Sequence, residues 1–284
     1  MAGRSAYGAA MVRATERFVP VDHRLFEDDI VIDFLPWPAR FMIRREWSRS
    51  RFSSLFERGA PGIRGALLCR TRYIDDAVKG SIARGIRTVV ILGAGLDTRP
   101  YRLRELAAAN VYEVDLPVVQ AFKKARLQRR FGDLPRNPRF IPVDFNSDSL
   151  HAALFKGGLN PREPAVFIWE GVSQYLKPEA ATAVFDTLAG RPSGSELVFT
   201  YVLDEAVTGR FRTDRSQEFR KSAGRRPEPW HFGIDPAGLA EFLSRRGLTL
   251  LDDAGAEDHI RRYLQPRQRE LAVSGIERVA LARV

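Results

Sequence analysis

The stretch that decides the fold is Thr88-Val89-Val90-Ile91-Leu92-Gly93-Ala94-Gly95-Leu96-Asp97-Thr98, followed by a second apolar run that closes at Asp115. Its first five residues are typical of a buried strand. A strand that breaks into a Gly-x-Gly turn lets a ligand approach bare backbone, and the N–H groups of the helix that follows favour polar or anionic ligand groups. An acidic residue about 20 positions past the glycines is placed to hold two ribose hydroxyls. The pattern predicts a nucleoside-cofactor site.

Length and composition narrow the class of protein. The 284 residues suffice for one large α/β domain with a cap, or for two small domains. Cys69 is the only cysteine, which excludes an intramolecular disulfide and a cysteine-based metal site, and the four scattered histidines show no metal-ligand spacing. The N-terminus lacks an apolar signal core, and no apolar run approaches the roughly 20 residues that span a bilayer. We expect a soluble, cytoplasmic protein with no metal and no membrane partner.

The formal charge of +10 comes almost entirely from arginine, since only six of the 45 basic residues are lysine. This bias suits a GC-rich genome as well as it suits a function. The arginines fall in separate groups without the regular aromatic interleaving of a single-strand binder. We do not expect a nucleic-acid partner, although charge alone leaves one open. The oligomeric state is not predicted.

From residue 88 onward, strand-like runs alternate with helical patterns. Helices are expected after Pro117, Pro178 and Pro236, because proline favours the first turn of a helix. Alternation of this kind implies right-handed βαβ units and a mainly parallel sheet, with ligands at the carboxyl ends of its strands. Seven strands are expected, at 88–93, 110–115, 139–144, 164–169, 195–202, 248–252 and 277–283.

Two segments depart from this alternation. Residues 1–64 read as a helical cap, and residues 65–284 as the cofactor-binding domain. Within that domain, a long polar stretch at about 203–235 ends in Pro229-Trp230-His231-Phe232-Gly233. An insertion of this length after a strand is usually a lid or a disordered loop, and the aromatic ending favours an ordered lid.

The glycine pattern helps to separate two classes of cofactor. A dinucleotide fold requires G-x-G-x-x-G, and Thr98 occupies the place of the third glycine. S-adenosyl-L-methionine has no pyrophosphate and does not require that fingerprint. It needs a ribose carboxylate, an adenine partner, a cation for its carboxylate and an acceptor for its ammonium group. Polar residues that meet each demand lie at strand ends or just before the first strand.

At this point the chain resembles the leucine carboxyl methyltransferase family, and within it the actinobacterial branch of small-molecule O-methyltransferases. The matching stretches share the family's order and spacing, and they are Arg70-Thr71-Arg72-Tyr73-Ile74-Asp75-Asp76, residues 90–99, Tyr112-Glu113-Val114-Asp115-Leu116-Pro117, Val143-Asp144-Phe145 and residues 170–176. The resemblance implies a class I methyltransferase fold, a Rossmann-like sheet with a helical cap, and S-adenosyl-L-methionine as the cofactor. It also assigns residues to parts of that cofactor: Asp115 to the ribose, Asp144 and Phe145 to the adenine, Gly93 and Gly95 to the methionine, Arg72 or Arg70 to the carboxylate, and Glu170 to the ammonium group.

The expected reaction is methyl transfer to a carboxylate or an acidic hydroxyl of a small, largely apolar molecule, for which a natural-product intermediate is one candidate. A carboxylate needs no base at pH 7, whereas a phenol benefits from one. His231, followed by Tyr175, is the best candidate in a weak set. Ser173-Gln174 stands where the family often has two apolar residues, which puts the acceptor chemistry in question. Two alternatives stay open: an RNA-modifying methyltransferase, and a cofactor-binding biosynthetic auxiliary protein without activity.

Overall fold

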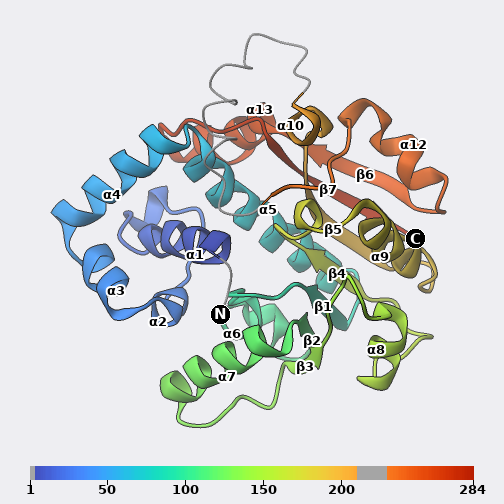
Figure 1. The fold of residues 1–284 in the computed structure, drawn as a ribbon. Coiled ribbons are helices and arrows are strands. Elements are labelled where there is room, and N and C mark those ends of the chain that lie inside the picture. Colours follow the sequence, from blue (N-terminus) through green and yellow to red (C-terminus); the bar gives the residue numbers. More distant parts are fainter. Residues whose placement is uncertain (1–3, 210–228) are drawn as a thin grey trace.

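The structure is a computed structural model that describes residues 4–209 and 229–284 (Figure 1). Its described strands form one seven-stranded sheet in the order β3-β2-β1-β4-β5-β7-β6. β1 to β5 run parallel, and β7 is antiparallel to both of its neighbours. The strands are β1 Thr88–Leu92, β2 Asn110–Asp115, β3 Arg139–Pro142, β4 Val166–Trp169, β5 Glu196–Val202, β6 Thr249–Ala254 and β7 Glu277–Arg283. The predicted mainly parallel, seven-stranded sheet is therefore confirmed.

Helices cover both faces of this sheet. The α-helices are α1 Arg4–Glu16, α2 Val31–Phe34, α3 Trp37–Arg44, α4 Glu46–Gly59, α5 Ile63–Ala83, α6 Arg99–Arg102, α7 Pro117–Phe131, α8 Leu150–Lys156, α9 Pro178–Ala189, α10 Asp204–Thr208, α12 Leu239–Ser244 and α13 Ala256–His259. Short 3-10 and π-helical turns join them: η1 Val21–His23, η2 Arg104–Leu106, η3 Ser173–Tyr175, η4 Pro236–Gly238, η5 Ile260–Leu264 and η6 Gln265–Arg267. The helices expected after Pro117, Pro178 and Pro236 are all present.

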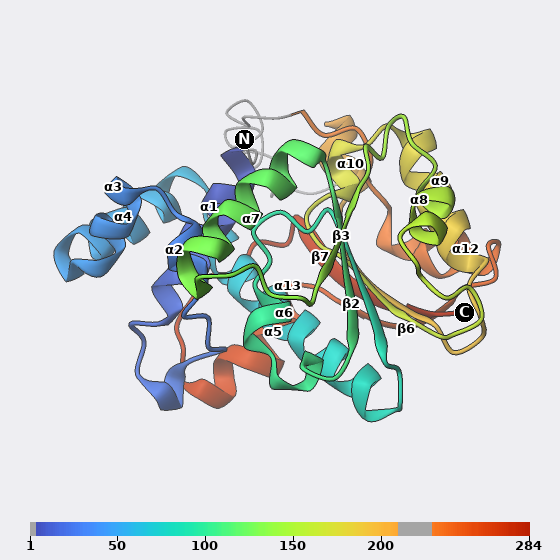
Figure 2. The ribbon, with the colours of Figure 1, turned by 90° about the horizontal axis from the view of Figure 1, so that it is seen from below.

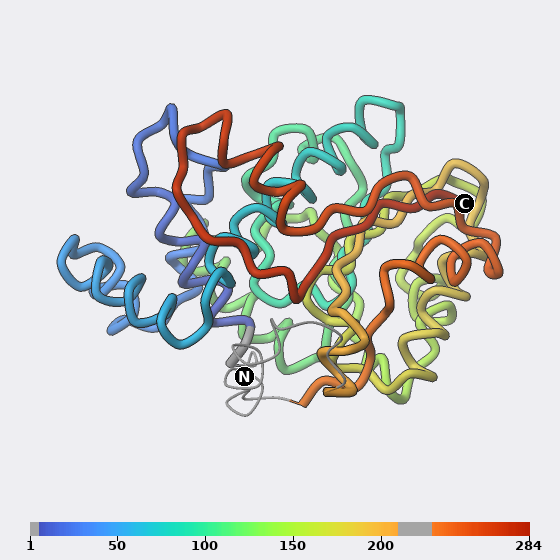
Figure 3. The backbone as a smooth tube through the Cα atoms, turned by 90° about the horizontal axis from the view of Figure 1, so that it is seen from above, coloured from blue at the N-terminus to red at the C-terminus, as the bar shows by residue number. Residues whose placement is uncertain are grey.

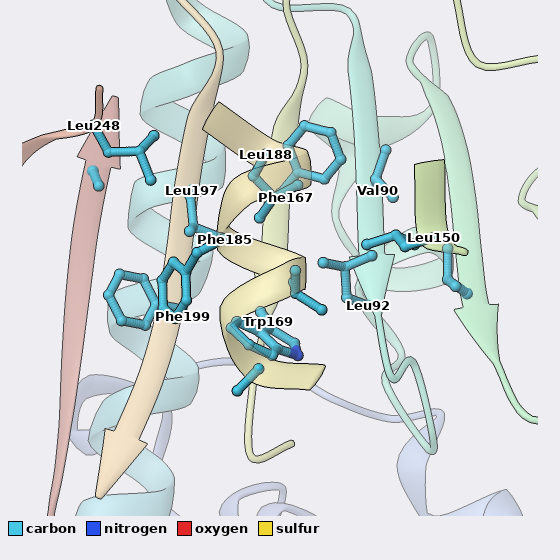
Figure 4. Close-up of a cluster of buried hydrophobic side chains, with 14 of the residues drawn as sticks. Val90, Leu92, Leu150, Phe167, Trp169, Phe185, Leu188, Leu197, Phe199 and Leu248 are labelled. Carbon is cyan, nitrogen blue, oxygen red and sulfur yellow. The ribbon is translucent and has the colours of Figure 1, made fainter. Parts of the chain in front are cut away.

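The side chains of each strand point alternately to the two faces of the sheet, and each face has its own hydrophobic core. On one face, Leu92, Trp169 and Phe199 pack with α8, α9 and α12, and the ring of Phe185 meets those of Trp169 and Phe199 edge-on at 5.2 and 5.1 Å (Figure 4). On the other face, α5 packs against the odd-numbered residues of β1. Figure 2 shows α5 and α7 on the side of the sheet opposite α8, α9 and α12. Because successive residues of a strand point to opposite faces, the continuous apolar run of β1 serves both cores.

The N-terminal helices are tied to a C-terminal segment. Glu16 accepts a hydrogen bond from Arg269 at 2.8 Å, and the ring of His23 bonds the carbonyl of Arg267 at 2.7 Å. Figure 3 shows the corresponding C-terminal tube running beside the N-terminal one. The boundary expected at residue 64 lies in the first turn of α5, so no linker separates the two predicted units.

Several predicted segments differ in their bounds, and two of them lie near the carboxyl ends of the strands. The third strand ends at Pro142 rather than at 144, although the N–H of Val143 still donates to the carbonyl of Asp115 at 3.0 Å. The expected lid at 203–235 falls largely on residues 210–228, outside the described residues. Its two described ends meet, because Leu203 and Ile234 form a parallel bridge. In the described ranges, no helix is long and apolar enough to cross a bilayer, and no group of histidine, cysteine and acidic side chains is arranged to bind a metal.

His259 makes part of the stability dependent on pH. Its ring lies edge-on to Tyr73 at 6.3 Å, and burial lowers its pKa from 6.5 to about 4. The unfolded chain therefore binds this proton more readily than the folded one between these values. We expect the free energy of unfolding to fall by about 3 kcal/mol for this group as the pH drops from 6.5 to 4. Urea unfolding of wild type and His259→Leu at pH 7 and pH 4.5 tests this. The variant should lose less stability, and equal losses in both proteins would contradict the assignment.

Candidate functional site

A cavity of about 670 Å³ lies where the loops after β1, β2, β3 and β4 meet helices α1, α4 and α5. This is the edge at which parallel strands present their carboxyl ends, and the volume lies within the range of small-molecule sites. The cavity is lined by bare backbone from residues 93–95, by acidic side chains from the strand ends, and by apolar side chains from α4, α5 and the residue before β7. It therefore combines a polar half with an apolar half.

The glycine turn forms the floor of the polar half. Gly93 has a φ of +67°, and a Cβ added there would lie 2.4 Å from Cγ2 of Val172. The N–H of Gly93 donates to the carbonyl of Val114 at 2.8 Å, which fastens the turn to the end of β2. The positive φ and the close approach of Val172 both require glycine here. The same turn leaves its backbone on the cavity wall, open to a ligand.

Asp115 closes the turn from the neighbouring strand. Its Oδ2 accepts a hydrogen bond from the N–H of Gly95 at 2.6 Å, and its Oδ1 accepts one from the N–H of Leu116 at 2.7 Å. Burial raises its pKa, and these two hydrogen bonds oppose the rise. The carboxylate lines the cavity with lone pairs to spare, so it is able to accept hydrogen bonds from two adjacent hydroxyl groups.

The loop after β3 supplies a second acidic position. Asp144 lines the cavity, and its Oδ1 accepts from the N–H of Asn146 at 2.9 Å. Phe145 lines the cavity beside it and also packs on the core between α8 and the sheet. Tyr175, from η3, is half-buried and also lines the cavity. An acidic group next to an aromatic ring suits a flat, nitrogen-rich ring system.

Glu170 lies between two guanidinium groups at the end of β4. Its Oε1 accepts from Nε of Arg70 at 2.9 Å, and its Oε2 accepts from Nη1 of Arg99 at 2.7 Å. Burial alone would raise the pKa of Glu170, but Arg99 and Arg70 hold it well below its usual range. Glu170 is therefore a fixed anion at the cavity wall and not a proton donor or acceptor at neutral pH.

Arg70 and Arg13 are the two cations of the described wall. Arg70 uses Nε for Glu170 and Nη1 for both oxygens of Glu277, at 2.7 and 2.6 Å. Its Nη2 lies against Gly171, 3.2 Å from where a Cβ would stand. Arg13, from α1, donates through Nη2 to the carbonyl of Leu96 at 2.5 Å, and its Nε lies 3.9 Å from Oδ2 of the buried Asp28, beyond hydrogen-bond distance. Each guanidinium thus keeps N–H donors for a ligand carboxylate.

Two of the predicted site residues lie away from the cavity. Arg72 binds Asp76 at 2.9 Å and the carbonyl of Leu25 at 2.8 Å, and it does not line the wall. His231 is exposed, and its backbone N–H donates to the carbonyl of Gln174 at 2.7 Å. Neither side chain is placed to touch a ligand in this cavity. The structure does bring together Gly93, Gly95, Asp115, Asp144, Phe145, Glu170, Arg70 and Tyr175.

Sequence reasoning missed three charged wall residues, Arg13, Asp97 and Glu277, whereas the sequence singles out Gln174 as a residue that could face the acceptor. Asp97 stood in the quoted motif, and its pairing with Arg99 at 2.6 Å was not foreseen. The motif's own Asp-Thr-Arg order offered a signal for that pair. Arg13 and Glu277 lie 83 and 207 residues from their partners Leu96 and Arg70, and no local pattern marks contacts of that length.

The profile of a known protein family, described as Leucine carboxyl methyltransferase, matches residues 6–189. The chain belongs to the leucine carboxyl methyltransferase family. The matched range contains the glycine turn, Asp115, Asp144 and the Arg70–Glu170 pair, so the cavity's polar half lies within the family's shared region. Trp230 and Glu277 lie outside it.

Curated proteins similar to this chain come from mycobacteria and related genera. A protein of Mycobacteroides abscessus, named "Putative S-adenosyl-L-methionine-dependent methyltransferase", is 32% identical over 210 residues, which cover 73% of this chain and 68% of that protein. A protein of Mycolicibacterium gilvum with the same name is 37% identical over 162 residues, covering 57% of this chain and 52% of that protein. The chain thus matches from about half to two-thirds of the length of these relatives.

Solved structures support the fold. A structure named as a "putative methyltransferase" from Thermobifida fusca superposes with a TM-score of 0.58 at 16% identity, covering 84% of this chain and 88% of its own. A DUF574 family protein from Streptomyces avermitilis gives a TM-score of 0.59 at 16% identity, covering 99% and 97%. At this identity the likeness concerns the fold alone, and it places the sheet among class I methyltransferase folds, as predicted.

Proposed function

We propose that this protein transfers the methyl group of S-adenosyl-L-methionine to an oxygen atom of a small, largely apolar molecule. The observation that carries the proposal is the hydrogen bond from the N–H of Gly95 to the carboxylate of Asp115, on the wall of a cavity at the strand ends. The chain's membership of the leucine carboxyl methyltransferase family supports the same assignment. The curated relatives named for this cofactor support it.

The charge of the wall suits this cofactor. Among the described lining residues, two guanidinium groups face five carboxylates, and Arg99 behind the wall pairs with two of these, which leaves a formal excess of two negative charges. S-adenosyl-L-methionine is a cation overall, because its sulfonium and ammonium charges exceed that of its carboxylate. A negative wall attracts such a ligand, whereas it would repel the pyrophosphate of a dinucleotide. Arg13 and Arg70 provide the local positive charge that the ligand's own carboxylate needs.

Several polar lining residues and Phe145 hold different parts of the cofactor. Asp115 holds the ribose hydroxyls, Asp144 and Phe145 hold the adenine, and the backbone at Gly93 and Gly95 lies under the methionine. Arg70 holds the methionine carboxylate with Arg13, in preference to Arg72. Glu170 fixes Arg70 and places negative charge near the ammonium group. When bound, the cofactor supplies a methyl group on a sulfonium that is a good leaving group.

The remaining wall would hold the acceptor. Phe56, Ile63, Val202 and Ile276 line the apolar half together with Trp230. These side chains exclude water from the methyl group and keep the acceptor in line with the breaking bond, which is the protein's main contribution to such a transfer. The exposed position of His231 fits a reaction that uses no histidine base.

Calorimetry on the purified chain tests the proposal. S-adenosylhomocysteine and S-adenosyl-L-methionine should bind, and NAD should not. Tighter binding of NAD would overturn the cofactor assignment. Transfer of a labelled methyl group to RNA or to a nitrogen atom would overturn the acceptor class. Binding of the cofactor without transfer to any acid or hydroxyl compound would point to an auxiliary protein instead.

A further inference from the structure

The most unusual polar group on the cavity wall is the amide of Gln174, in η3. The residue is 5% exposed and lines the cavity, and its buried Oε1 has no hydrogen-bond partner. Nε2 of the same amide has no partner among the described residues either. A buried carbonyl that is left unpaired is costly, and such groups are nearly always satisfied in native proteins. The unpaired amide of Gln174 on the cavity wall is therefore available to form hydrogen bonds with a ligand.

The backbone around Gln174 is held firmly, so the free amide does not result from a loose loop. The carbonyl of Gln174 accepts hydrogen bonds from the N–H groups of His231 and Phe232, at 2.7 and 3.4 Å. The hydroxyl of the preceding Ser173 donates to the carbonyl of Thr200 at 2.9 Å. These bonds fix η3 between β5 and the segment after residue 229. The amide is thus presented from a rigid support at the wall shared with Val172 and Trp230.

We infer that Gln174 binds the methyl acceptor, and that the accepting group enters as a neutral hydroxyl. This inference rests on the proposed function and narrows it. A hydroxyl satisfies both ends of the amide, because it donates to Oε1 and accepts from Nε2. A carboxylate has no hydrogen to donate and would leave one end of the amide facing an anion.

The electrostatics of the wall point the same way. Five carboxylates and two guanidinium groups line the described wall, and the buried Arg99 behind it offsets one further negative charge through Asp97 and Glu170. Arg70 is already held by Glu170 and Glu277. A cationic cofactor reduces the negative excess without removing it. A second anion would then enter a negative environment of low dielectric, where repulsion is strong. A neutral hydroxyl avoids this repulsion.

The methyl transfer requires no base on the protein. A lone pair of the acceptor oxygen forms the new C–O bond as the C–S bond breaks and the sulfur takes the bonding pair. The proton of the alkylated oxygen, hydrogen-bonded until then to Oε1 of Gln174, passes to water as the product leaves the cavity. Gln174 neither gains nor loses a proton in this scheme. It is a positioning residue that holds the oxygen in line.

A matched pair of probes tests the inference: 1-naphthol, which is neutral at pH 7, and 1-naphthoate, which is an anion. Calorimetry is done on the full chain saturated with S-adenosylhomocysteine. We expect naphthol to bind wild type at least tenfold more tightly than naphthoate, and Gln174→Leu to weaken naphthol binding about tenfold. Equal or tighter binding of naphthoate, failure of naphthol to bind, or unchanged naphthol affinity in Gln174→Leu would overturn the inference.

Gln120 provides a matched control for folding. It is also a 5% exposed glutamine, but its Nε2 donates to the carbonyls of Glu113 and Ile141, at 3.1 and 2.8 Å. Gln120→Leu should lower the melting temperature by several degrees and leave the preference for naphthol unchanged. Gln174→Leu should keep or raise the melting temperature of the ligand-free protein, because it removes an unpaired group. A drop equal to that of Gln120→Leu would show a structural role and overturn the inference. Lack of S-adenosylhomocysteine binding by wild type would instead count against the proposed function.

Discussion

Replacing Arg99 with methionine is expected to lower the free energy of unfolding by about 3–5 kcal/mol, the range seen when one partner of a buried ion pair is removed. Arg99 is fully buried and is the centre of an ionic network. Its Nε pairs with Asp75 at 2.7 Å, and its Nη1 pairs with Asp97 at 2.6 Å and with Glu170 at 2.7 Å. Methionine fills a similar volume but leaves these carboxylates in the interior with less compensating charge.

Urea unfolding of Arg99→Met beside Arg104→Met measures the effect. Arg104 lies only five residues away, is exposed, and should change stability by less than about 0.5 kcal/mol when it is replaced. Arg99→Met should also weaken S-adenosylhomocysteine binding, because Glu170 loses one of the two cations that fix it. A loss below 1 kcal/mol would mean that Arg102, which pairs with Asp75 at 2.7 Å, carries the network without Arg99.

The second large effect is expected at Asp115. Asp115→Ala should lower the affinity for S-adenosylhomocysteine by well over tenfold, because hydrogen bonds to a charged group contribute roughly 1.5–3 kcal/mol each and the ribose offers two. The variant also frees the N–H of Gly95, so the glycine turn loses an anchor.

Calorimetry with Asp115→Ala and the exposed control Asp133→Ala separates binding from general effects of charge. A circular dichroism melt should show that Asp115→Ala remains folded. An unchanged dissociation constant in that folded variant would remove Asp115 from the ribose role.

The sheet could be predicted because its strands carry their own signals. β1 is a run of buried, mostly β-branched residues that ends in a turn with a positive φ at Gly93, and β2 has valine and tyrosine among its buried residues. The position of β7 could not be predicted, because the sequence of residues 277–283 does not record which strands it joins or in which direction. Pairing is set by the whole sheet, not by the strand alone.

The candidate site also has parts that could be predicted from the sequence and parts that could not. Residues within the motif from 93 to 115 could be assigned from spacing, whereas the choice between Arg70 and Arg72 could not. Two positions along α5 differ by about 200° around the helix axis, so only one of these side chains faces the cavity. Which one does so depends on how α5 packs on the sheet, and the packed structure favours Arg70.

The position of β7 also bears on how the protein is made. β7 follows every other strand in the sequence, yet it lies in the sheet between β5 and β6. While the chain leaves the ribosome, β6 therefore has no partner strand until residues 277–283 emerge. Arg70 cannot pair with Glu277 until the 207 residues that separate them in the sequence have been synthesised. Parallel β1 to β5 can assemble earlier. A nascent chain is thus expected to hold an unfinished sheet edge and an unfinished ligand site until its final strand is inserted, and this interval is when it most needs protection from aggregation.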